Sequence, residues 1–243
     1  MPVRSLIRAG ALAALAALLL LPATSPGAEP IRVGYLGPLT GIFAAAGKDM
    51  LDGLKMAFEE VNYEAAGRKI ELVEEDTEGN PATAQAKYRK LVAQDRIHVL
   101  DGVLLINIGY ALVPNIERDR LPSLFLTTPD EITKRKPARY VIRSNFAASQ
   151  PMHALGDYAA RTLKYKRVAA IAMDNGFGHE GIGGFQRVFE GLGGRVVQKT
   201  WVPLNAMDFA PYLTQVPRDV DAVVQVFVAG QAVRFAKQYG ESA

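Results

Sequence analysis

The chain has 243 residues, a formal net charge of +3 at pH 7 and no cysteine. Without cysteine it can form no disulfide, no thiolate metal site, no cysteine nucleophile and no lipid anchor on a terminal cysteine. Hydrophobic residues make up 49% and charged residues 22% of the sequence, which is the composition of an ordinary globular protein.

The N-terminal segment, residues 1–28, is predicted to be a cleaved secretory signal peptide. Arg4 and Arg8 precede an unbroken run of 13 apolar or small residues at positions 9–21. A membrane-spanning helix needs about 20 residues, so this shorter run favours a signal peptide over an uncleaved membrane anchor. The small residues that follow offer a cleavage site after Ala28. We therefore expect a periplasmic protein that is not a lipoprotein.

Most of the positive charge lies in this leader. Residues 1–28 carry two arginines and no acidic residue, so the rest of the chain has a net charge of +1. A nucleic-acid-binding protein is expected to carry a strong basic patch. We therefore expect no nucleic-acid partner.

The first half of the remaining chain is predicted to alternate between strands and helices. Short apolar runs predict strands at 31–36, 69–75, 98–104, 121–126 and 140–143. Apolar residues at helical spacing predict helices over 50–61 and 111–118. A third helix is expected to begin at Asn80-Pro81, because asparagine caps a free backbone amide and proline at the first helical position sacrifices none.

The same alternation restarts near residue 150. Helices are expected at 150–163, 185–192, 209–216 and 231–239, and strands at 167–173, 195–201 and 220–228, with a glycine-rich turn at 175–184. Strands that alternate with helices imply parallel sheets covered on both faces. The fold class is therefore predicted to be α/β, with two lobes at 29–147 and 148–243.

Ligands of parallel α/β lobes bind beyond the carboxyl ends of the strands. Those ends are the glycine-rich or hydroxyl-rich loops at 37–47, 105–109, 127–131, 174–181 and 227–230. Backbone amides at helix N-termini suit a carboxylate, and Phe43 and Phe177 suit an apolar or ring-bearing body. Either phenylalanine could instead close the end of a sheet without touching a ligand.

Six stretches of this chain together resemble the Leu/Ile/Val-binding family of ABC-transporter solute-binding proteins, the type I periplasmic binding proteins. They are GPLTGIFAAAGKDMLDGLKMAFEEVN, ELVEEDTEGNPATAQAKYRKLV, LPSLFLTTPDEIT, RVAAIAMDNGFGHEGIGGFQRVF, MDFAPYL and AVRFAKQYG. The later stretches are most similar to members thought to take aromatic acids. The resemblance implies a hinged clamp that captures a small carboxylate, such as an apolar or branched-chain amino acid, an amide or an aromatic acid. It also implies a membrane permease as partner, no enzymatic activity and no cofactor.

The resemblance, together with the strand-end loops, nominates a set of ligand-binding residues. Family members anchor a carboxylate after the third and fourth strands, where this chain has Leu105-Ile106-Asn107 in place of the frequent paired serines, and then Thr127 and Thr128. The apolar exchange favours an aromatic or apolar carboxylate. The full set is Phe43, Ala46, Leu105, Ile106, Asn107, Thr127, Thr128, Phe177, Phe227 and Val228. Two complete lobes need about 300 residues, so the resemblance also implies an incomplete second lobe.

Three competing sites are not favoured. The GxGxxG pattern at 176–181 lacks an acidic residue at the end of the next strand, which a dinucleotide site needs. The acidic run at 74–78 lacks the ligand spacing of a calcium loop. Ser149, His153 and Asp157 lie four residues apart on one predicted helix and do not converge as a triad would. We expect no catalytic residue and no metal site. A sensory receptor module with the same fold is the main alternative to a transport protein.

Overall fold

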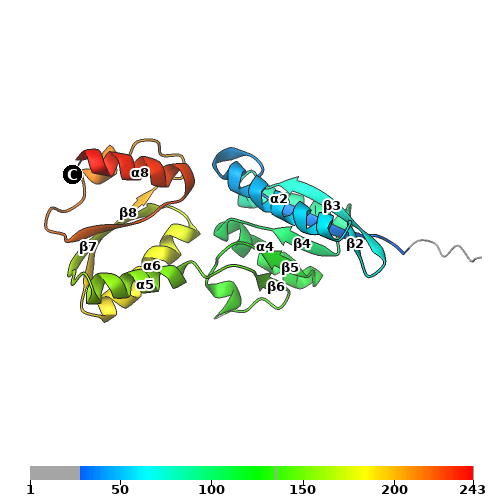
Figure 1. Ribbon diagram of the computed structural model, residues 1–243, viewed down its shortest axis with the longest axis horizontal. Helices are drawn as coiled ribbons and strands as arrows, with labels where there is room; N and C mark the ends of the chain where they lie inside the picture. The colour runs from blue at the N-terminus through cyan, green and yellow to red at the C-terminus, as the bar shows by residue number, and fades with distance from the viewer. Residues whose placement is uncertain (1–27, 135, 243) are drawn as a thin grey trace, which may run out of the picture.

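The computed structural model describes residues 28–134 and 136–242, which form two lobes, each built on its own sheet (Figure 1). The predicted leader, residues 1–28, lies outside the described residues except for Ala28. Among the helices that the structure describes, none has the length and apolarity needed to cross a membrane.

The first lobe is a six-stranded sheet in the order β2-β3-β1-β4-β5-β6. Its strands are β1 (Ile31–Gly37), β2 (Glu64–Ala65), β3 (Arg68–Asp76), β4 (Val99–Gly102), β5 (Ser123–Phe125) and β6 (Val141–Arg143). All pairings are parallel except the short β2–β3 hairpin. Because β3 and β4 lie on opposite sides of β1, the strand order reverses between β1 and β4. The crevice at such a reversal is where open α/β sheets bind ligands.

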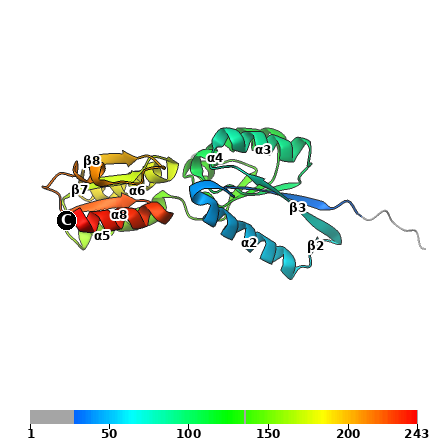
Figure 2. The same cartoon turned by 90° about the horizontal axis from the view of Figure 1, so that it is seen from above.

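Helices cover both faces of the first sheet. They are η1 (Gly41–Phe43), α2 (Ala44–Glu60), α3 (Pro81–Ala93), α4 (Ile106–Asp119) and η2 (Glu131–Thr133). Figure 2 shows α3 and α4 on one face and α2 on the other. The core under α3 and α4 contains fully buried Tyr88, Leu91 and Ile116. As expected, Asn80 caps α3, since its side-chain oxygen accepts hydrogen bonds from Ala82 N and Thr83 N.

The second lobe is a parallel three-stranded sheet in the order β8-β7-β9. Its elements are α5 (Ser149–Arg161), β7 (Arg167–Met173), α6 (Gly176–Gly191), β8 (Arg195–Val202), α7 (Ala210–Leu213), β9 (Ala222–Val226) and α8 (Ala229–Ser242). Helix α8 lies on one side of this sheet and α5 and α6 on the other (Figure 1).

Alternate residues of β7 belong to two different cores, which is why its sequence is apolar throughout. Val168, Ala170 and Ala172 pack with Phe185 and Phe189 under α5 and α6. Ile171 and Met173 belong to the opposite cluster, which also contains Phe209, Phe227 and Phe235. The predicted α/β class, with parallel sheets flanked by helices, is therefore confirmed.

The glycine-rich segment 175–184, predicted as a turn, is instead the first half of α6. Asn175 caps this helix through a hydrogen bond from Gly178 N to its side-chain oxygen. A Cβ on Gly184 would lie 2.7 Å from the Cα and carbonyl oxygen of Ser149, and a Cβ on Gly156 would lie 2.8 Å from the carbonyl oxygen of Phe185. Gly184 of α6 and Gly156 of α5 thus permit close packing of the two helices, and local sequence does not distinguish such glycines from those of a turn.

Other boundaries also differ from the prediction. Helix α4 begins at Ile106, not at 111, so the segment 105–107 starts a helix. Strand β4 covers only 99–102 of the predicted 98–104, and β9 covers only 222–226 of the predicted 220–228. Phe227 and Val228 therefore follow β9 directly.

Candidate functional site

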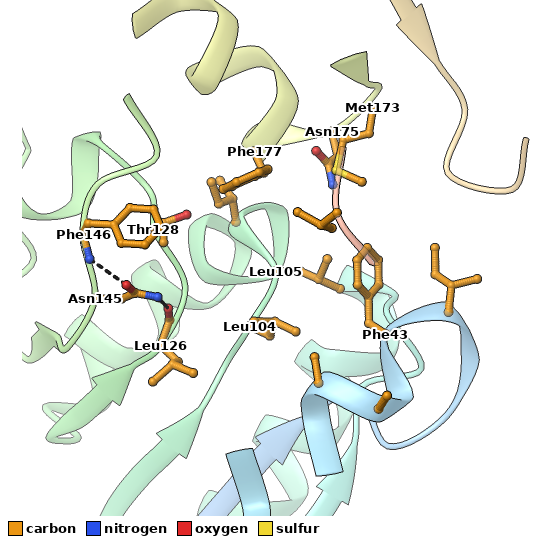
Figure 3. A pocket seen from close by; sticks show the side chains of 15 residues that line it. Phe43, Leu104, Leu105, Leu126, Thr128, Asn145, Phe146, Met173, Asn175 and Phe177 are labelled. Carbon is orange, nitrogen blue, oxygen red and sulfur yellow. Dashed lines mark hydrogen bonds between the residues drawn. The ribbon is translucent and has the colours of Figure 1, made fainter. Parts of the chain in front are cut away.

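A cavity of about 300 Å³ lies between the two lobes, where their strand reversals face each other (Figure 3). In the second lobe the order reverses between β7 and β9, so the segments after these strands turn toward the segments after β1 and β4. Seven of the ten predicted ligand residues line the cavity. They are Phe43, Ala46, Leu105, Ile106, Thr128, Phe177 and Val228.

The other three predicted residues lie elsewhere. The side-chain oxygen of Asn107 accepts a hydrogen bond from Gly176 N at 2.9 Å and so joins α4 to α6. Thr127 is 1% exposed, and its hydroxyl forms no hydrogen bond with the described residues. Phe227 packs edge-on against Phe209, at 5.2 Å between ring centroids, within the second-lobe core.

Eight further residues line the cavity without having been predicted. They are Ile42, Ala45, Leu104, Leu126, Asn145, Phe146, Met173 and Asn175. Most of them are close in sequence to a predicted residue, because the walls of the cavity are formed mainly by strand ends and by the first turns of the helices that follow them. Asn145 and Phe146 come from the connection between β6 and α5, which the sequence indicates only as the boundary between lobes.

Three phenylalanine rings form much of the cavity wall. Phe43 comes from η1, Phe146 from the connection between lobes and Phe177 from the first turn of α6, and Figure 3 shows them on different sides of the same space. Phe146 is 47% exposed. An exposed aromatic ring in the wall of an apolar cavity can stack against a bound aromatic molecule, which would shield the ring from water.

Polar groups at the cavity are few. The Thr128 hydroxyl forms no hydrogen bond with the residues that the structure describes. Asn175 uses its side-chain oxygen to cap Gly178 N, which leaves the amide NH₂ group to donate elsewhere. Both ends of the Asn145 amide form a hydrogen bond, because its NH₂ group donates to Leu126 O at 3.2 Å and its oxygen accepts from Phe146 N at 2.8 Å. Asn145 thus holds the backbone that carries the Phe146 ring.

The remaining polarity comes from helix N-termini. Both α4 and α6 begin at the cavity, with Ile106 and Asn175 among its lining residues. A helix N-terminus carries a partial positive charge and free amides, which favour an anion. Among the described residues that line this cavity, no side chain is charged.

Outside the cavity, polar contacts join the lobes along α4 and α6. The Glu180 carboxylate of α6 accepts hydrogen bonds from the Tyr110 hydroxyl at 2.7 Å and from Asp130 N at 2.9 Å. Burial raises the pKa of the Glu180 carboxyl above its ordinary range, the charges of Asp130 and Glu131 add to this rise, and the two hydrogen bonds oppose it. Burial likewise raises the pKa of the Tyr110 hydroxyl.

In the described residues, none of the three competing sites has the arrangement of groups that its chemistry needs. Asp157 pairs with Arg161 at 2.9 Å and not with His153, so no Ser–His–Asp relay forms. In the GxGxxG segment, Gly178 lies against the end of β7, because a Cβ on this residue would clash with the carbonyl oxygen of Met173. This glycine therefore serves packing of the helix on the strand. In the acidic run, Glu75 is bound by Lys87 and Lys90. Across residues 28–134 and 136–242, no group of three or more side chains is arranged to hold a metal ion.

Known proteins resemble this chain in sequence and in fold. A curated relative, Leu/Ile/Val-binding protein homolog 6 of Brucella abortus (strain 2308), is 27% identical over 198 residues, which is 81% of this chain and 50% of the relative. The chain thus spans about half the length of this relative.

Two solved structures are similar in fold over most of the chain. A solute-binding protein of an ABC transporter from R. palustris, in complex with benzoate, matches with a TM-score of 0.81 and 26% identity, over 88% of this chain and 59% of that one. A solute-binding protein from Rhodopseudomonas palustris BisB5, in complex with 3,4-dihydroxy benzoic acid, matches with a TM-score of 0.79 and 30% identity, over 88% of this chain and 58% of that one.

The family profile described as "Periplasmic binding protein" matches residues 30–242, nearly all of the described chain. Members of this family are solute-binding proteins and not enzymes. The chain therefore belongs to the periplasmic binding protein family.

Proposed function

We propose that this protein is the extracytoplasmic solute-binding component of an ABC importer and that it captures an aromatic carboxylate between lobes 29–147 and 148–243. The observation that carries the proposal is the cavity between the lobes, which is walled by three phenylalanine rings and has no charged side chain among its described lining residues. Ring-bearing walls with few polar groups suit a flat apolar ligand whose orientation is set by a small number of hydrogen bonds.

The ligand's carboxylate is bound by neutral donors. The free amides at the start of α4, the Thr128 hydroxyl and the Asn175 NH₂ group all lie at the cavity. Such donors stabilise an anion without the desolvation cost of burying a counter-charge.

An α-amino acid fits this cavity less well than an aromatic acid. Its ammonium group would be buried beside helix N-termini, whose partial charge is also positive. A buried ammonium needs a carboxylate or several carbonyl partners, and none of the described residues that line the cavity is acidic. The two R. palustris proteins described above, with benzoate and 3,4-dihydroxy benzoic acid bound, support the same ligand class.

Capture follows from the position of the cavity between two lobes. A ligand that contacts both lobes at once shifts the population toward the arrangement in which the lobes are together. Delivery to a membrane permease is the transport step that would follow.

Thermal-shift measurements on the full-length protein test the ligand class. Benzoate at 100 times its dissociation constant should stabilise the protein by about 2.7 kcal/mol, and leucine at the same concentration should give a smaller shift. Phe146→Leu should weaken benzoate binding because it removes a wall ring. Phe58→Leu is the matched control, since Phe58 lies on α2 outside the cavity. A larger shift with leucine, isoleucine or valine than with any aromatic acid would contradict the proposal.

Periplasmic location and removal of residues 1–28 belong to the same proposal. Expression with the native leader followed by N-terminal sequencing of the periplasmic fraction should give Glu29 as the first residue. Retention of Met1 in membranes would instead support an uncleaved anchor.

A further inference from the structure

A second cavity, of about 410 Å³, adjoins the first. The two cavities share the side chains of Ile42, Phe43, Met173 and Val228, so they are neighbouring chambers of one cleft. The far wall of the second chamber is formed by the segment after β8, at 204–207, and by the first two turns of α8. A single-ring acid that occupies the first chamber leaves this space open.

The far wall is held in place by Gln231. This side chain is 8% exposed, and its NH₂ group donates to Pro203 O and to Leu204 O, each at 3.0 Å. These two bonds tie α8 to the segment after β8 and fix the orientation of the amide. Its oxygen is buried and forms no hydrogen bond with the described residues. The start of α8 and the segment after β8 are therefore fixed relative to each other.

The second chamber is also lined by an exposed cation that has no partner among the described residues. Arg234 lines it and forms no ion pair and no hydrogen bond within the described chain. None of the described residues lining either chamber is acidic. The start of α8 lies at the same place, so its partial positive charge adds to that of the guanidinium.

We propose that the second chamber is a subsite for a second anionic group on the ligand, which Arg234 binds. This inference rests on the proposed function, because it assumes that the first chamber holds the ring of an aromatic carboxylate. The ligand class it assigns is an aromatic acid with a second carboxylate, on the ring or on a short chain from it. A planar guanidinium suits a carboxylate, because it can donate two parallel hydrogen bonds.

Calorimetric titration of the full-length protein with matched probes tests the subsite. The probes are benzoate, terephthalate, 3-(4-carboxyphenyl)propanoate and the methyl ester of each diacid at the second carboxyl group. At least one diacid should bind about five- to tenfold more tightly than its own ester, as expected for one charge-assisted hydrogen-bonded pair near the surface. Arg234→Gln should abolish this difference and leave benzoate affinity unchanged, while Arg234→Lys should keep part of it.

Lys237→Gln is the matched control, because Lys237 is an exposed cation on the same helix and lines neither chamber. It should leave the preference for the diacid intact. If neither diacid binds more tightly than its ester, or if Arg234→Gln and Lys237→Gln reduce the preference equally, the subsite is refuted. If the unsubstituted protein does not bind benzoate at all, the proposed function itself is refuted. That outcome is distinct from failure of the subsite alone.

Discussion

Removing the Tyr110 hydroxyl is expected to loosen the contact between the two lobes. In the structure this hydroxyl donates to the half-buried carboxylate of Glu180 at 2.7 Å. A hydrogen bond to a charged group contributes about 1.5–3 kcal/mol. If the bond exists only when α4 and α6 are in contact, Tyr110→Phe should raise the ratio of separated to joined lobes by about 10- to 150-fold.

Single-molecule energy transfer measures this ratio directly. The chain has no cysteine, so Arg89→Cys and Arg195→Cys place one dye on an exposed position of each lobe. Combining Tyr110→Phe with Glu180→Gln in a double-mutant cycle isolates the energy of this pair from other effects of each substitution. Tyr158→Phe is the matched control, because Tyr158 is an exposed tyrosine of α5 whose hydroxyl forms no hydrogen bond with the described residues.

Two results would refute this reasoning. The first is an unchanged distribution of transfer efficiencies in Tyr110→Phe, which would mean that the bond persists when the lobes separate. The second is additivity of Tyr110→Phe and Glu180→Gln, which would mean that the two side chains are not coupled.

Three further predictions concern pH and stability. Burial raises the pKa of Glu180 when the lobes are joined. The joined arrangement is therefore favoured most below the ordinary carboxyl pKa of about 4.3, and it loses this contribution as the pH rises through the raised pKa. Energy transfer measured from pH 4 to 7 should show this trend, and Glu180→Gln should flatten it. Asn80→Ala should cost about 1 kcal/mol through loss of the α3 cap, seen as faster hydrogen exchange of α3 amides, whereas unchanged exchange would show that the cap is dispensable. Phe185→Ala should destabilise the second lobe by about 3–5 kcal/mol, because it empties a fully buried position. The fluorescence of Trp201, the only tryptophan in the sequence, follows unfolding of that lobe, and a loss of stability below about 1 kcal/mol would contradict the role of Phe185 in its core.

Much of the candidate site was predictable from the segments that follow the strands, although Thr127 and Phe227 of these segments lie outside the cavity lining. Phe43, Leu105, Thr128 and Val228 were predicted from the strand-end loops, which gather at one edge of each parallel sheet, together with the family resemblance, and all four line the first cavity. Phe146 was missed because the connection between lobes carries no periodic pattern of its own.

Asn107 shows the opposite case. Its amide has the right chemistry for a ligand and lies at a strand-end position in sequence. In the structure its oxygen is used by Gly176 N of the other lobe. Whether a polar side chain meets a ligand or a neighbouring helix depends on what lies across the cleft, and that partner is 69 residues away in the chain.

The sequence by itself determined the alternation of strands and helices, the α/β class and the presence of two lobes, because these follow from local periodicity and chain order. Only the tertiary structure decided that Gly184 permits close packing of α6 on α5, which residues close the cavity, and that Arg234 shares a cleft with Phe43. Each of these depends on distances between segments far apart in the chain, which no local pattern of residues records.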